Sequence, residues 1–194
     1  MADYDRLLRT AIGEEPADLL IRSINLINTA TRDIYPATIG ICEDTIAFVL
    51  DESNGKIAEG INITASARQV IDGKDLWASP GLIDSHMHIE STHLTPEYFA
   101  AAVVPLGITT VAQDPHEIAN VLGKEGVEYM QAASMGLPLR VLTFVPTCVP
   151  AVPGLETSGA VFGAEEVSAL LDESRAVPDQ PGSYETIGLA EVMD

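Results

Sequence analysis

The chain has 194 residues, of which 46% are hydrophobic and 20% are charged. This composition is that of a folded protein of one or two domains and excludes an intrinsically disordered chain. A formal net charge of −19 excludes nucleic acid as a partner, because a phosphate backbone would be repelled. The sequence has no apolar run of the roughly 20 residues that cross a bilayer, no signal-peptide pattern, and only two cysteines. We therefore expect a cytoplasmic protein without a membrane partner or a disulfide framework.

The residue pattern of the first part of the chain changes from helical to β-like at residue 17. Residues 4–12 carry a short helical pattern that stops at Gly13, which predicts an N-terminal helical arm over residues 1–16. Residues 17–79 then hold short β-like runs separated by Asn, Gly, Asp and Pro, including KIAEGINITA at residues 56–65. These runs predict a meander of strands.

From Pro80 onward, apolar β segments alternate with helical segments. This alternation predicts βαβ units around a parallel sheet buried on both faces. The expected strands are GLIDSHMH (81–88), GITTVAQD (107–114), LRVLTFV (139–145) and the start of ETIGLAEVMD (185–194). Residues 150–163 form a Pro/Gly-rich loop that is long enough to be functional.

The histidines of PGLIDSHMHIES stand two positions apart at the end of the first of these strands. Residues two apart share a face of a strand, so His86 and His88 should project together and could hold one metal ion. Asp84 and Glu90 would share a face in the same way if the strand persisted. The alternative is a pair of polar residues that face water at a strand end. The apolar residues before them favour the metal site, because a buried strand would deliver both histidines to the carboxyl edge of the sheet.

PGLIDSHMH resembles the signature of the amidohydrolase superfamily. HIEST, GITTVAQDPHEIANVLG, TCVPAVPG with the later SGA, and GLAEVMD together resemble the adenine deaminases of bacteria and archaea. The resemblance covers residues 17–194. It implies a small β-sandwich portion over residues 17–79, followed over residues 80–194 by the N-terminal half, about four βα units, of a metal-dependent (β/α)8 barrel.

The resemblance also implies a set of metal ligands. His86 and His88 would bind the more buried ion, and Glu191 would bridge two divalent ions where many relatives use a carboxylated lysine. The ions would be manganese or iron, with zinc possible. The alternative for Glu191 is a solvated acid near the end of the chain.

Four further residues are expected to contact the substrate or to support the ligands. They are Glu90, Ser91, His116 and Glu117. Since adjacent strand residues point to opposite sides, only one of His116 and Glu117 should point at the metals. Asp114 and Pro115 are also typical of a helix start, as N-cap and first helical residue. We interpret Cys148 as a packing residue.

The activity implied by the resemblance is purine salvage by adenine deamination, in which metal-activated hydroxide converts adenine and water to hypoxanthine and ammonia. No catalytic residue is assigned, because the family's acid–base aspartate is expected beyond Asp194. We therefore expect the chain to be inactive alone and to form a homo-oligomer or to pair with a C-terminal half. Three alternatives stay open: another amidohydrolase (a cyclic amidase or deacetylase), a non-catalytic half-barrel that needs a partner chain, and a simple β-plus-α/β binding protein.

Overall fold

The computed structural model describes residues 3–53, 67–173 and 185–193. The chain divides into two compact units, Met1–Pro80 and Gly81–Asp194. The strand expected at residues 56–65 lies outside the described residues. Separate domains with limits at residues 16 and 79 stay a prediction.

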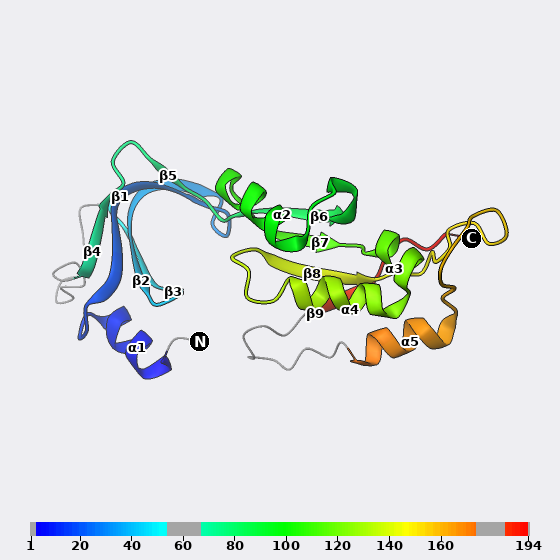
Figure 1. The fold of residues 1–194 in the computed structure, drawn as a ribbon. Helices are drawn as coiled ribbons and strands as arrows, with labels where there is room; N and C mark the ends of the chain where they lie inside the picture. The colour runs from blue at the N-terminus through cyan, green and yellow to red at the C-terminus, as the bar shows by residue number, and fades with distance from the viewer. Residues whose placement is uncertain (1–2, 54–66, 174–184, 194) are drawn as a thin grey trace. The chain divides into compact units, whose positions relative to one another are not determined.

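The described residues of the first unit form one helix and a five-stranded sheet (Figure 1). The strands follow the order β3-β2-β1-β4, with β5 also paired to β1. β1, β2 and β3 are antiparallel neighbours, which confirms the predicted meander for residues 17–51 only, because β4 and β5 run parallel to β1. All strands within residues 3–53 and 67–80 belong to this one sheet, so the second layer of a sandwich stays a prediction. The elements are α1 (Tyr4–Ile12), β1 (Ala17–Asn28), β2 (Asp33–Cys42), β3 (Thr45–Asp51), β4 (Ala67–Asp72) and β5 (Trp77–Ala78).

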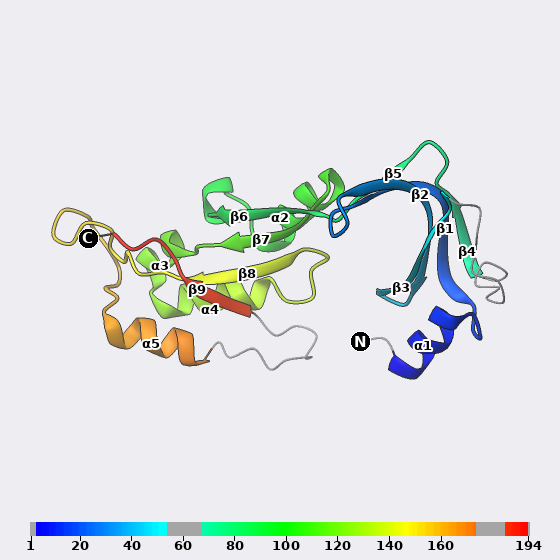
Figure 2. The ribbon, with the colours of Figure 1, turned by 180° about the vertical axis from the view of Figure 1, so that it is seen from behind.

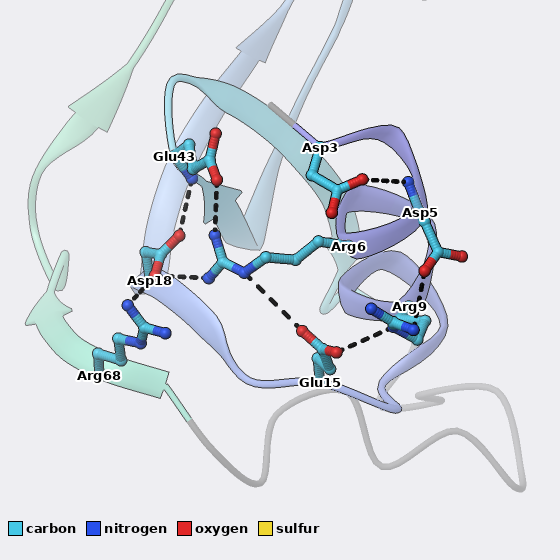
Figure 3. A network of polar contacts seen from close by, with 8 residues as sticks. All are labelled: Asp3, Asp5, Arg6, Arg9, Glu15, Asp18, Glu43 and Arg68. Carbon is cyan, nitrogen blue, oxygen red and sulfur yellow. Dashed lines mark hydrogen bonds and ion pairs between the residues drawn. The ribbon is translucent and has the colours of Figure 1, made fainter. Parts of the chain in front are cut away.

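An ion-pair network links α1 to the sheet of the first unit (Figure 3). The Arg6 guanidinium donates to Asp18 of β1 over 2.7 Å and to Glu43, in the turn after β2, over 3.2 Å. Glu15 joins the network at 3.8 Å from Arg6 and 2.9 Å from Arg9. The hydrogen bond from Arg6 lowers the pKa of Asp18 from 3.8 to about 2. The network therefore fixes the N-terminal helix against the sheet through charges that persist at neutral pH.

The second unit is built on four parallel strands in the order β6-β7-β8-β9, which confirms the predicted parallel sheet. Residues 150–163 contain no helix or strand, as expected for the Pro/Gly-rich loop. None of the described helices is long and apolar enough to cross a membrane. The strands are β6 (Leu82–Met87), β7 (Ile108–Gln113), β8 (Arg140–Val145) and β9 (Glu185–Leu189). The helices are η1 (Glu90–Thr92), α2 (Pro96–Val103), η2 (Val104–Leu106), α3 (His116–Leu122), α4 (Lys124–Ala133) and α5 (Ala164–Glu173).

The two faces of this parallel sheet differ. Helices α2 and α4 lie in front of the strands in Figure 1 and behind them in Figure 2, so both cover the same face. Val141 of β8 packs into a buried cluster with Phe99 of α2 and Met130 of α4. On β9, by contrast, Ile187 and Leu189 are 42% and 47% exposed. One face is therefore a hydrophobic core, and the described residues leave the other face uncovered.

Candidate metal centre

His86 and His88 meet at the carboxyl end of β6. Their Nε2 atoms lie 3.3 Å apart, although the strand ends at Met87 and His88 follows it. His88 Nδ1 lies 2.8 Å from the main-chain oxygen of Asp114. Since a carbonyl oxygen only accepts, Nδ1 must carry the proton, and Nε2 of neutral His88 keeps its lone pair. A histidine held in this way is oriented to ligate a metal through Nε2.

Glu191 follows β9, the outer strand at the opposite edge of the sheet from β6, and its side chain approaches His86. Its Oε1 lies 3.2 Å from His86 Nε2. The backbone that carries it is fixed to the segment after β8, because Ala190 N–H donates to Val145 over 2.9 Å and the Thr147 hydroxyl donates to the Glu191 carbonyl. His86 is thus close to both other predicted ligands, His88 and Glu191. That all three bind metal stays a prediction.

Asp114, directly after β7, is a residue whose role sequence reasoning missed. Its side chain is fully buried, its Oδ2 lies 3.0 Å from His116 Nδ1, and its Oδ1 has no hydrogen-bond partner. The helix-start interpretation of Asp114 is wrong: α3 begins at His116, its N-cap is Pro115, and no side chain caps it. The carboxylate is instead close to both predicted histidine ligands, within 4.8 Å of ring nitrogens of His86 and His88. The sequence did contain a clue to Asp114, because it lies at the end of a predicted parallel strand.

His116 and Glu117 lie in the first turn of α3 rather than on a strand. The expectation that they point to opposite sides therefore does not apply, since it rested on strand geometry. The His116 ring packs edge-on against His88 with 4.5 Å between centroids, and Glu117 accepts a hydrogen bond from Ser91 over 2.5 Å. Both residues offer an atom within 4.8 Å of a His88 nitrogen.

Glu90 does not continue the strand. The chain turns into η1 after Ile89, so the expectation that Glu90 shares a strand face with Asp84 is wrong. Glu90 Oε1 accepts from the Ile118 N–H over 3.3 Å, whereas Oε2 is buried without a partner. Burial raises the pKa of this carboxyl group, because removal from water disfavours its charged form.

Cys148 is buried in the loop after β8, as expected of a packing residue, and it also lies close to candidate ligands. Its sulfur lies within 4.8 Å of ligand atoms of Asp114, His116 and Glu191. Burial raises the pKa of the thiol, and the neighbouring Asp114 carboxylate adds to this effect. A lone cysteine without a second cysteine or histidine at metal-site spacing gave no signal in the sequence.

The residues present fit a bound divalent cation. Imidazole, carboxylate and thiol groups from the ends of four strands converge, and a buried carboxylate oxygen among them, Asp114 Oδ1, lacks a hydrogen-bond partner. A buried polar atom without a hydrogen bond is costly, and a metal ion satisfies carboxylate oxygens directly. Mixed nitrogen and oxygen donors suit manganese, iron and zinc.

Strand order and the convergence of imidazole, carboxylate and thiol groups together describe a candidate metal site at the carboxyl edge of a parallel α/β sheet. The model of the Amidohydrolase family matches residues 77–190, and the chain belongs to this family. The chain is also 41% identical over 188 residues to an adenine deaminase of Thermosipho melanesiensis. It is 43% identical over 192 residues to those of Serratia proteamaculans and Staphylothermus marinus. These alignments cover 97–99% of the chain but only 29% of each relative's length.

A solved structure shares the fold. Atrazine chlorohydrolase TrzN from Arthrobacter aurescens TC1, complexed with zinc, matches with a TM-score of 0.59 at 20% identity. The match covers 90% of this chain and 47% of the other. At this identity the similarity concerns the fold alone.

Proposed function

We propose that this chain supplies the N-terminal part of an adenine deaminase active site, in a protein that converts adenine and water to hypoxanthine and ammonia. The similarity to curated adenine deaminases supports this substrate, and the metal-site geometry supports hydrolytic chemistry. Because the chain spans 29% of those relatives, the complete activity is part of the proposal. Adenine deamination would assign the protein to purine salvage.

The observation that carries the proposal is the contact between His86 and Glu191. β6 and β9 are the two outer strands of a four-stranded sheet, and three strand spacings amount to about 14 Å in a flat sheet. The side chains at their ends are nevertheless 3.2 Å apart. Strong curvature of the sheet accounts for such an approach, as expected of about half of a (β/α)8 barrel with its ligands on the inner side. In this proposal, residues 17–79 contribute the accompanying β-sandwich.

His86, His88 and Glu191 would hold the metal, with the Glu191 carboxylate placed to bridge a second ion. Manganese or iron is proposed, and zinc is possible, as in the TrzN complex. A bound divalent ion would supply a nucleophile near neutral pH by lowering the pKa of a coordinated water to about 7. The Asp114 carbonyl orients His88 for this task through the bond to Nδ1.

Glu90, Ser91, His116 and Glu117 would border the substrate beside these ligands. The Ser91 hydroxyl fixes the Glu117 carboxylate, and the Asp114 carboxylate fixes the His116 ring. Glu90 Oε2, which is buried without a partner, would be available to a hydrogen-bonding group of the substrate. We assign no acid–base residue.

A chimera tests the proposal directly. Replacing the matching N-terminal portion of the Serratia proteamaculans relative with this chain should give a protein that releases hypoxanthine and ammonia from adenine. The same chimera with His86→Ala should lose at least 100-fold in rate while keeping its circular dichroism spectrum, since the mutation removes a ligand and not a core side chain. The His93→Asn chimera is the matched control, because His93 is exposed and lies outside the ligand groups. A folded, metal-loaded chimera that hydrolyses a cyclic amide but leaves adenine intact would contradict the adenine assignment.

A further inference from the structure

Four side chains form a second group of candidate ligands beside the two histidines of β6. Asp114, His116, Cys148 and Glu191 each offer one atom, and these four atoms lie within 4.8 Å of one another. They follow three adjacent strands, β7, β8 and β9, whose carboxyl ends meet at one edge of the sheet. We call this group the Cys148 cluster.

Three of the four side chains of the Cys148 cluster bear or can acquire negative charge, and two of these three are buried. Asp114 is 0% and Cys148 2% exposed. Asp114 Oδ1, although buried, has no hydrogen-bond partner, and the ion-pair partner of Oδ2 is His116, which is charged only if protonated. A buried carboxylate oxygen without a partner is costly. A cation at this position would remove that cost.

We propose that the Cys148 cluster binds a divalent ion of the zinc class through thiolate, imidazole and carboxylate ligands, next to the ion held by His86 and His88. Sulfur, nitrogen and oxygen donors in a set of four match the ligands of tetrahedral zinc sites. Binding breaks the S–H bond of Cys148, the sulfur keeps the electron pair as a thiolate ligand, and the proton passes to solvent.

The chemistry of this second site differs from that of the first. The thiolate makes the Cys148 cluster softer than a set of two histidines and a glutamate, so it should prefer Zn²⁺ and Co²⁺ to Mn²⁺. Glu191 belongs to the Cys148 cluster and also contacts His86, and Asp114 lies close to both histidines. Either carboxylate could therefore link two neighbouring ions. The proposal goes beyond adenine deamination, because it concerns the ligands alone and holds for any substrate.

Cobalt spectroscopy of the metal-free 194-residue chain tests this assignment without any activity measurement. Co²⁺ bound to a thiolate absorbs in the near ultraviolet, whereas Co²⁺ bound only to histidine and carboxylate lacks this charge-transfer band. We expect the absorbance of this band to rise as Co²⁺ is added and to stop rising when each cluster holds one Co²⁺ ion. Addition of Zn²⁺ should then remove the band. An equal concentration of Mn²⁺ should leave it unchanged. The band should survive in the double variant His86→Ala/His88→Ala.

The two cysteines provide matched variants. Both are buried, but Cys42 lies in β2 of the first unit. Cys42→Ser should keep the band, and because Cys148 is then the only thiol in the chain, this spectrum decides the matter even if Cys148→Ser fails to fold. A folded Cys148→Ser chain should lose the band. Absence of the band from the wild-type or Cys42→Ser chain, its persistence in Cys148→Ser, or its equal displacement by Mn²⁺ would overturn the proposal.

Discussion

His88 Nδ1 donates a hydrogen bond over 2.8 Å to the main-chain carbonyl of Asp114, so the end of β7 sets the orientation of a ring at the end of β6. The acceptor belongs to the backbone, and a change of the Asp114 side chain would therefore leave this bond in place. The Asp114 carboxylate meanwhile contacts His116. One residue thus positions two imidazoles by separate groups, and the bond to Nδ1 leaves Nε2 of His88 free to act as a ligand.

Removal of the His88 ring should abolish stabilisation by Mn²⁺, an ion that the Cys148 cluster should bind less readily than Zn²⁺ or Co²⁺. Wild-type chain at a Mn²⁺ concentration of 100 times the dissociation constant should gain about 2.7 kcal/mol, which is a rise of several degrees in Tm. His88→Ala should show almost no rise, because a ligand with a fixed orientation is lost. Differential scanning calorimetry with and without Mn²⁺ measures both values. His93→Asn should respond like wild type, since asparagine tolerates the left-handed backbone found there (φ 60°). An undiminished metal response in His88→Ala would rule His88 out as a ligand.

Glu191→Gln should weaken divalent-ion binding by at least about tenfold, or about 1.4 kcal/mol. The amide preserves the size of the side chain but removes the anionic oxygen that lies 3.2 Å from His86. Isothermal titration of the metal-free chain with Mn²⁺ gives the affinity. Glu156→Gln is the control, because it removes an exposed carboxylate from the loop after β8. Equal affinities in the two variants would mean that Glu191 is only a solvated acid.

The sequence was most informative where one rule of geometry applied. Parallel strands were recognisable as apolar runs whose carboxyl ends share an edge, and the family resemblance singled out Glu191 at that edge as a partner of His86. The roles of Asp114 and Cys148 could not be derived in this way. Both depend on how the chain turns after a strand, and Asp114 followed by Pro115 is equally typical of a helix start. The position of Glu90 was missed for the same reason, because nothing in IEST signals that the strand gives way to a 3-10 helix.

Gly126→Ala should destabilise the second unit by about 1–3 kcal/mol, although alanine is the better helix former by about 1 kcal/mol. A Cβ at this position of α4 would lie 2.7 Å from the carbonyl oxygen of Ile118 in α3, and backbone cannot give way as a flexible side chain can. Since α3 carries His116, the displaced helix should also disturb the Cys148 cluster. Urea unfolding followed by circular dichroism measures the loss.

Gly163→Ala is the matched control, because it adds the same methyl group where only a flexible side chain lies nearby. The nearest atom to its Cβ would be the carboxylate end of Glu166 at 3.3 Å, which can rotate away. This variant should stay within about 0.5 kcal/mol of wild type. If Gly126→Ala were as stable as Gly163→Ala, α3 and α4 could not be in the close contact described here.

The stability of the first unit should depend on pH through the ionisation of Asp18. Its folded-state pKa is lowered from 3.8 to about 2, chiefly by the hydrogen bond from Arg6. Below pH 4 the unfolded chain takes up a proton on Asp18 before the folded chain does, so the stability that Asp18 provides is fully present above this pH. It is lost as the pH falls through about 2. Asp18→Asn should therefore lower the urea midpoint at pH 7, and the difference from wild type should shrink steadily between pH 4 and pH 2.

Tryptophan fluorescence can follow this unit selectively, because Trp77 in β5 is the only tryptophan of the chain and pairs with β1. Asp33→Asn removes an exposed carboxylate from the neighbouring strand β2 and is the control. Its difference in urea midpoint from wild type should not shrink between pH 4 and pH 2. Since the ion pairs of Arg6 are partly exposed, added salt should reduce the Asp18→Asn difference at pH 7 without moving the pH window. A difference between Asp18→Asn and wild type that stayed constant from pH 7 to pH 2 would show that Asp18 acts through its shape and not through its charge.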